Sequence, residues 1–153
     1  MCINKLIMME SEWYIPPLDR YSIVFAPNDL RRMFRSRDRI KGHADYYIHF
    51  EARYRCVYVV IEVEGSKIGK ALRQLESTVR RLKRNGREVD RIMIVLKRSS
   101  LTKYEQRIYV VRDNKLYEKR GTTVKPILID GIHVEVYTVR DIRRLRRLLG
   151  VGI

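Results

Sequence analysis

Residues 57–64 form an apolar, β-branched run with the sequence Val-Tyr-Val-Val-Ile-Glu-Val-Glu. A run of this kind predicts a central strand that is buried on both faces. Because side chains alternate along a strand, Glu62 and Glu64 share one face with Val60. Two carboxylates at the end of a buried strand are unfavourable unless a cation, a proton or water meets them. This conflict between position and residue type marks the end of the strand as a candidate functional site.

A long amphipathic helix is predicted directly after this strand, over residues 67–85. Its apolar positions recur at helical spacing: Ile68, Ala71, Leu72, Leu75, Val79 and Leu82. Gly86 stands where a glycine commonly ends a helix. A further strand is expected at 89–96, so residues 57–96 predict a strand–helix–strand unit with a right-handed crossover and two parallel strands.

The remaining elements are expected to be shorter. On the N-terminal side, Pro16 and Pro17 favour irregular structure over residues 1–20. This is followed by a strand at 21–25, a helix capped by Asn28 and a strand at 45–50. On the C-terminal side we expect a polar link at 97–103, strands at 107–112, 115–119, 124–129 and 132–137, and a last helix capped by Thr138 with Asp141. The order predicts one α/β domain over residues 1–153, with a mixed central β-sheet flanked by helices.

The composition narrows the class of protein. The chain has 153 residues and two cysteines, Cys2 and Cys56, which give no disulfide framework. No apolar run approaches the ~18 residues of a membrane span. We therefore expect a cytoplasmic protein without a membrane partner. The abundance of charged residues beside four Asn and two Gln favours a thermophile as the source.

The net charge of +15 is concentrated in three segments. Residues 31–41 carry a net +5, residues 67–87 a net +7 and residues 140–147 a net +4, which leaves −1 for the rest. Positive charge gathered on predicted helices points to a polyanion, most often nucleic acid. The alternative is a basic, solvated surface of the kind that heat-adapted proteins carry.

A third carboxylate is expected beside the first two. Asp45 begins one predicted strand, and Glu62 and Glu64 end the next. If the two strands are antiparallel neighbours, Asp45 lies near the end that holds Glu62. Clustered carboxylates suit Mg²⁺ or Mn²⁺, which prefer oxygen ligands and promote phosphodiester hydrolysis by polarising the phosphate and generating hydroxide.

With these features the sequence resembles the PD-(D/E)XK nuclease superfamily. The matching residues are Ala-Asp-Tyr-Tyr at 44–47, a sixteen-residue gap after Asp45, Val-Ile-Glu-Val-Glu at 60–64 and the helix that follows. The resemblance covers about residues 28–96 and implies a restriction-endonuclease-like core, with residues 97–153 adding a sheet extension and a C-terminal helix. It also implies that Asp45 and Glu62 are metal ligands.

Glu64 is a departure from the superfamily pattern, because it stands where the catalytic lysine is usual. Some restriction enzymes of the superfamily use Glu-x-Glu, and in other members the lysine lies on the helix, where this chain has Lys67 and Lys70. Gln74 matches a helix glutamine of nuclease relatives. The residues expected in catalysis are Asp45, Glu62, Glu64, Lys67 and Lys70, with the three carboxylates as metal ligands. In the alternative, catalysis is lost and Lys67, Lys70 or Arg73 satisfies the glutamates.

A row of polar residues along the same helix is expected to border the carboxylate cleft and to follow a phosphate backbone. It consists of Lys67, Lys70, Gln74, Thr78 and Arg81. The alternative is the ordinary polar flank of an amphipathic helix. His43 precedes Asp45 by two and is either a phosphate contact or a loop residue. The residues expected to bind nucleic acid are Arg31, Arg35, His43, Gln74 and Arg81.

The sequence therefore predicts a metal-dependent endonuclease, or a close relative, that acts on DNA. A second hypothesis is a catalytically inactive nucleic-acid-binding module of the same fold, such as a subunit of a DNA-processing complex. A third is a small interaction protein whose charge reflects thermal adaptation alone. Pairing into a homodimer or with a partner subunit would suit a nuclease that cuts two strands. Residues 97–137 predict only a sheet extension or a contact surface.

Overall fold

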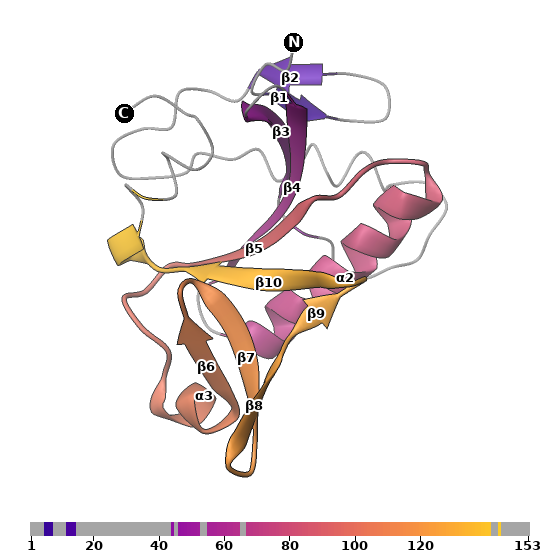
Figure 1. Cartoon of the computed structure of the whole chain (residues 1–153). Helices are drawn as coiled ribbons and strands as arrows, with labels where there is room; N and C mark the ends of the chain where they lie inside the picture. Colours follow the sequence, from indigo (N-terminus) through magenta and orange to yellow (C-terminus); the bar gives the residue numbers. More distant parts are fainter. Residues whose placement is uncertain are drawn as a thin grey trace.

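A computed structural model describes residues 5–7, 12–14, 44, 46–52, 55–64, 67–141 and 144 of the chain. Its strands are β1 (Lys5–Ile7), β2 (Glu12–Tyr14), β3 (Tyr46–Ala52), β4 (Arg55–Glu64), β5 (Arg91–Leu96), β6 (Tyr109–Arg112), β7 (Lys115–Arg120), β8 (Thr123–Pro126), β9 (Leu128–Ile129) and β10 (Ile132–Tyr137). Its helices are α2 (Ile68–Arg84), α3 (Lys103–Ile108) and the 3₁₀ turn η1 (Val139–Asp141). The described part is a mixed α/β structure (Figure 1).

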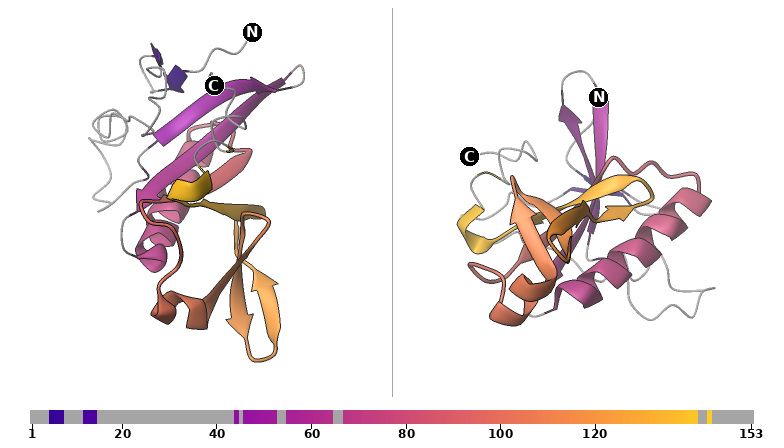
Figure 2. Two further views of the ribbon diagram at one scale, coloured as in Figure 1. Left: turned by 90° about the vertical axis from the view of Figure 1, so that its left-hand side faces the viewer. Right: turned by 60° about the horizontal axis from the view of Figure 1, so that its bottom comes forward.

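The ten described strands join in one mixed sheet. Its main order is β2-β1-β3-β4-β5-β10-β7-β6, with β8 on β7 and β9 on β10. Strands β3 and β4 pair antiparallel, whereas β4, β5 and β10 run parallel to one another. The parallel pairing of β4 with β5 confirms the strand–helix–strand unit predicted from the sequence. Helix α2 makes this connection and lies along one face of the central strands (Figure 2).

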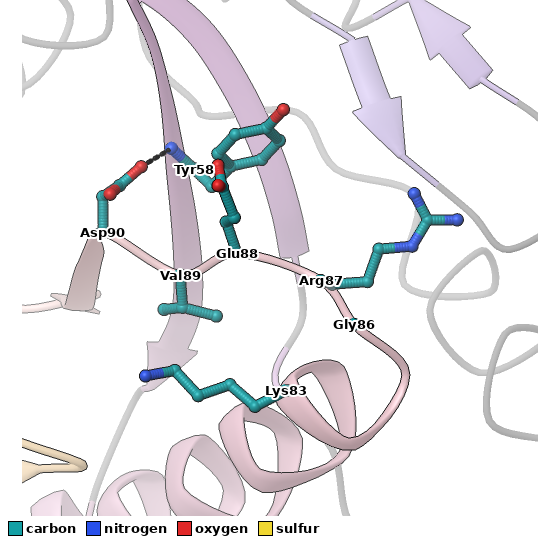
Figure 3. Close-up of a pocket in the computed structure, with 7 residues that line it drawn as sticks. All are labelled: Tyr58, Lys83, Gly86, Arg87, Glu88, Val89 and Asp90. Carbon is teal, nitrogen blue, oxygen red and sulfur yellow. Dashed lines mark hydrogen bonds between the residues drawn. The ribbon is translucent and has the colours of Figure 1, made fainter.

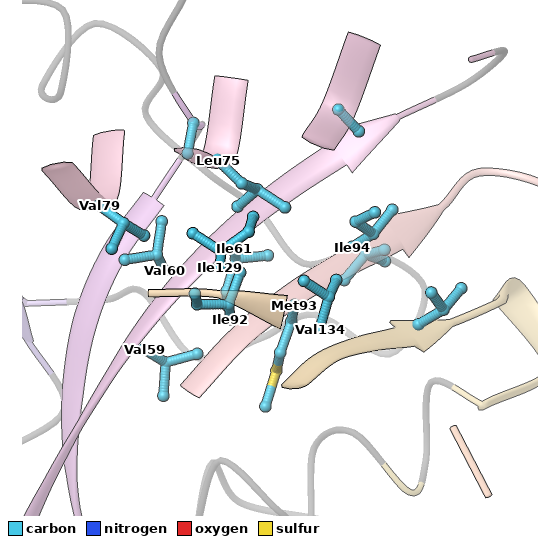
Figure 4. Packing of buried hydrophobic residues seen from close by; sticks show 14 of the residues in the cluster. Val59, Val60, Ile61, Leu75, Val79, Ile92, Met93, Ile94, Ile129 and Val134 are labelled. Atoms are coloured by element: carbon cyan, nitrogen blue, oxygen red, sulfur yellow. The ribbon is translucent and has the colours of Figure 1, made fainter. Parts of the chain in front are cut away.

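The core confirms that β4 is buried on both faces. Val59, Val60 and Ile61 are each 0 % exposed, although they alternate between the two faces of the sheet. Val60 lies on the face toward Leu75 and Val79 of α2, and Val59 points the other way (Figure 4). Apolar side chains are therefore required at residues 59–61, because both faces of β4 are covered there.

Helix α2 ends as the sequence predicts. Gly86 adopts a left-handed φ of 73°. The N–H of Arg87 bonds the carbonyl of Leu82 at 2.9 Å, and the N–H of Gly86 bonds that of Lys83 at 3.0 Å. These two hydrogen bonds form a Schellman motif, which satisfies carbonyls that the helix end would leave unpaired.

Two tight turns in the C-terminal half also follow from local sequence. Asp113 and Asn114, between β6 and β7, have φ values of 51° and 59°. Asp130 and Gly131, between β9 and β10, have φ values of 50° and 78°. Positive φ at both central residues matches the twist of a β-hairpin, and Asp, Asn and Gly tolerate it best.

Some predicted elements are wrong. The region from 103 to 108, expected as a link and the start of a strand, is helix α3, because Thr102 and Glu105 form a capping box. The strand expected at 124–129 is split into β8 and β9, separated by Ile127 after Pro126. Residues 1–20, expected to be irregular, contain the short strands β1 and β2.

The chain after β10 begins with the 3₁₀ turn η1, where the predicted cap residues Thr138 and Asp141 bond each other. The N–H of Thr138 bonds Asp141 Oδ2 at 2.8 Å, and the N–H of Arg140 bonds Thr138 Oγ1 at 3.2 Å. The strand expected at 21–25, the helix capped by Asn28 and most of the last helix lie outside the described residues. In the described part, no helix combines the length and the apolar character needed to cross a membrane.

Candidate active site

The three parallel strands end at the same edge of the sheet. Glu64 at the end of β4 is opposite Leu96 at the end of β5, and Tyr137 at the end of β10 is opposite Val95. Helix α2 also begins at this edge, because Ile68 follows β4 after a short connection. In open α/β sheets, ligands bind outside the carboxyl ends of the strands. The end of β4, which carries Glu62 and Glu64, therefore lies at the edge of the sheet where such sites form.

Glu62 is the expected site residue that the structure describes best. It is 3 % exposed and lies opposite Ile94 of β5. By strand alternation it shares with Val60 the face that α2 covers. This low exposure confirms the burial that the apolar run predicts for the carboxylate. Removing a carboxylate from water is strongly unfavourable unless hydrogen bonds or a positive charge compensate it.

Position 45 is bracketed by two described neighbours. Asp45 itself lies outside the described residues, as do His43, Arg31 and Arg35, and Glu64 is described by its backbone alone. Tyr46 is opposite Ile61, the residue before Glu62. On the other side, the N–H of Ala44 donates to Thr78 Oγ1 of α2 at 2.7 Å. The start of β3, the end of β4 and the middle of α2 therefore come together.

The polar row along α2 changes character from one end to the other. Lys67 and Lys70 are exposed, and Gln74 is half-buried. Thr78 is 0 % exposed and Arg81 is 4 % exposed. Thr78 lies against the chain at Ala44, whose N–H donates to its hydroxyl. Burial of Arg81 weighs against its direct contact with a nucleic-acid backbone, whereas the basic side chains of the first turn are open to solvent.

A second carboxylate, Glu105 of α3, stabilises the start of α2. Lys67, the residue that precedes the helix, makes no side-chain cap. Instead, Glu105 Oε2 accepts hydrogen bonds from the N–H of Ile68 at 3.3 Å and from Arg98 Nη2 at 2.8 Å, while Oε1 accepts from the N–H of Thr102 at 3.0 Å. Burial alone would raise the pKa of Glu105, but the hydrogen bonds from Arg98 and from the backbone lower it.

Sequence reasoning missed Arg98 and Glu105. The Thr-x-x-Glu spacing of Thr102 and Glu105 was the available signal for α3, but nothing local connects Glu105 to α2. These residues tie the segment after β5 to the first turn of α2, at the same edge as Glu62.

Two hollows lie near the central strands. One, of about 680 Å³, is lined by Tyr58, Lys83, Gly86, Arg87, Glu88, Val89 and Asp90 (Figure 3). It lies where α2 leads into β5, at the edge opposite the carboxyl ends of the strands. The other, of about 380 Å³, is lined by Leu96, Ser100, Leu101, Gln106, Tyr109, Val110, Val111, Lys119, Val136 and Thr138. It lies at the carboxyl edge but includes none of the expected carboxylates.

The expected metal site stays a prediction. Among the described residues there is no group of three or more His, Cys, Asp and Glu side chains that could hold a metal ion. Of the three expected ligands, only Glu62 has a described side chain.

Comparison of the chain with protein-family models, with curated proteins and with solved structures gives no match. The functional argument therefore depends on the chain's own residues and on the arrangement of its strands.

Proposed function

We propose that this protein is a metal-dependent nuclease-like protein that acts on DNA, with a restriction-endonuclease-like core. The observation that supports it best is the buried carboxylate of Glu62 at the carboxyl end of β4. The order β3, β4, α2 and β5, with an antiparallel and then a parallel pairing, matches the order that the superfamily resemblance implies. Burial of a carboxylate costs free energy, and coordination of a metal ion is one of the ways in which proteins offset that cost.

The donor set suits a hard divalent cation. Asp45, Glu62 and Glu64 would supply carboxylate oxygens, which Mg²⁺ and Mn²⁺ prefer over nitrogen or sulfur. When bound, the metal would polarise the scissile phosphate and lower the pKa of the attacking water. The pairing of Tyr46 with Ile61 supports this set of three ligands, since it places the start of β3 beside the end of β4.

Two exposed lysines at the start of α2 would act on the substrate. Lys67 directly precedes the helix, and Lys70 lies in its first turn. Both are exposed, so their ammonium groups can approach a phosphate without rearrangement of the core. Either would offset the negative charge that develops on the phosphate in the transition state.

A catalytically inactive nucleic-acid-binding module is the second candidate. Glu64 favours it, because this position would add a negative charge where the superfamily usually has a catalytic lysine. In that case Glu62 is a structural acid, and the basic surface of α2 carries the function.

The test is cleavage of supercoiled, linear and single-stranded DNA, and of RNA, in Mg²⁺ or Mn²⁺. We expect metal-dependent cleavage by the wild type, its loss in Asp45→Asn and Glu62→Gln, and its retention in Glu88→Gln. Glu88 is an exposed acid at the opposite edge of the sheet and serves as the matched control. Salt-sensitive DNA binding without cleavage would support the inactive module, and neither cleavage nor binding would reject both candidates.

A further inference from the structure

The outward face of α2 carries a stripe of arginines separate from the row discussed above. Arg73, Ser77, Arg80 and Arg84 are spaced four, three and four residues apart, so they follow one line along the helix. At 100° per residue this line is opposite the buried positions Leu75 and Leu82. Arg73, Arg80 and Arg84 are all exposed. We call these three side chains the arginine stripe.

The surface between these side chains is hollowed. A depression of about 270 Å³ is lined by Arg73, Glu76, Ser77, Arg80 and Arg84. Three of its five lining residues are permanently charged cations. Glu76 is the one acid, and it holds Arg80 Nη2 at 2.5 Å in an exposed ion pair. The hollow is thus a cationic site in which Glu76 would compete with a bound anion for Arg80.

The length of the stripe suits an extended anion. Eleven residues separate Arg73 from Arg84, which is about 16 Å at 1.5 Å per residue. One strand of a DNA duplex advances about 3.4 Å per phosphate along the axis, so the stripe spans about five phosphates. A small anion would use one arginine, whereas a nucleic-acid backbone can contact all three.

The packing of α2 argues against a membrane as the partner. A helix that binds a lipid surface buries an apolar face in it. The apolar face of α2 is already buried against the sheet, with Leu75, Val79 and Leu82 at 0 % exposure. Among the described residues the exposed large hydrophobic side chains are Tyr104 and Leu128, and neither lies on α2.

We propose that the arginine stripe binds the phosphate backbone of nucleic acid. The inference deepens the proposed function and rests on it for the identity of the partner. Because α2 begins at the edge of the sheet that holds Glu62, a nucleic-acid strand bound along the stripe would extend toward the candidate active site. The stripe would position the substrate without taking part in the chemistry.

The experiment measures binding of a fluorescent duplex and a single strand by anisotropy over a range of salt concentrations. The test variant is Arg73→Gln/Arg80→Gln/Arg84→Gln. The control Arg112→Gln/Lys115→Gln/Lys125→Gln removes the same charge from exposed positions on β6, β7 and β8. We expect the test variant to bind about a hundredfold more weakly near 0.1 M salt. Its log–log salt slope should be smaller by about 2 to 3, at about 0.9 per phosphate contact.

The variant Glu76→Gln gives a test in the opposite direction. Removing the acid that competes for Arg80 should tighten binding several-fold, which loss of fold cannot imitate. Equal weakening in the test and control variants would overturn the stripe while leaving the proposed function intact. Wild-type protein that binds no nucleic acid, or that binds only anionic phosphatidylserine vesicles, would overturn both proposals.

Discussion

The carboxylate of Glu105 in α3 accepts a hydrogen bond from the backbone N–H of Ile68, the first residue of α2, at 3.3 Å. Residues that cap a helix usually directly precede it, whereas here the cap comes from 37 residues further along the chain. The negative charge also interacts favourably with the positive end of the helix dipole. The start of α2 is therefore stabilised by tertiary structure, and its position depends on α3 and Arg98.

Replacement of Glu105 should destabilise the fold. Glu105→Ala leaves Arg98, whose side chain is 18 % exposed, without this carboxylate, and it also removes the acceptor for Ile68. We expect a loss of about 3 kcal/mol in the free energy of unfolding, measured by urea denaturation. Glu118→Gln alters an exposed pair with Arg120 and should change stability by less than about 0.5 kcal/mol. Equal effects of the two substitutions would contradict the capping role.

The contribution of Glu105 should depend on pH. Its pKa is lower in the folded protein than the ordinary carboxyl value of 4.5, because Arg98 and two backbone N–H groups bind the charged form. The carboxylate thus stabilises the fold above that value, and the stabilisation is lost as the pH falls through the folded-state pKa. The difference in unfolding free energy between wild type and Glu105→Gln should shrink from pH 7 to pH 3. A difference that is constant over this range would show that charge plays no part.

Replacement of Gly69, in α2, and of Gly86, just after it, by alanine should change the free energy of unfolding in opposite directions. Gly86 has a φ of +73°, so Gly86→Ala should destabilise by about 1 kcal/mol. Gly69 lies in the helix, and an added Cβ would meet its nearest neighbour, Arg73 Nη1, at an ordinary 3.8 Å. Gly69→Ala should therefore stabilise by up to about 1 kcal/mol. Thermal unfolding of both variants gives the comparison, and a shift of the same sign in both would contradict it.

The ion pair between Arg91 of β5 and Glu135 of β10 joins two parallel strands. Arg91 Nε donates to Glu135 Oε2 at 2.8 Å, and the hydroxyl of Tyr137 donates to Glu135 Oε1 at 2.6 Å. Arg91→Met should cost about 2–3 kcal/mol, because it leaves a largely buried carboxylate without its cation. The double variant Arg91→Met/Glu135→Leu should recover much of that loss. A double variant less stable than Arg91→Met would show that the pair stabilises beyond the burial of its own charge.

Strand β4 could be predicted from the sequence because it is a continuous β-branched apolar run, and helix α2 because its apolar residues recur at helical spacing over many residues. The turns at Asp113 and Asp130 were predictable since few residue types accept a positive φ. Helix α3 was missed because its six residues carry too little periodicity, although its capping box was present. Strands β1 and β2, of three residues each, depend on pairing with each other and with β3.

The candidate site could be predicted only as far as local patterns reach. The burial of Glu62 follows from the run that contains it. The burial of Arg81 does not, because it depends on which segment packs against the flank of α2. The contact of Glu105 with Ile68 is also a product of tertiary structure, and no spacing in the sequence reports it.

The place of β10 between β5 and β7 has a consequence for how the protein is made. Strands β5 and β7 both precede β10 in the chain, yet along the main order of the sheet they are connected only through it. During synthesis on the ribosome, β5 presents an unpaired edge until residues 132–137 emerge, whereas most of the corresponding edge of β7 pairs with β8. Open edges of this kind pair readily with other chains. Among the described strands, β10 comes last in the chain and is thus the one that covers the open edge of β5.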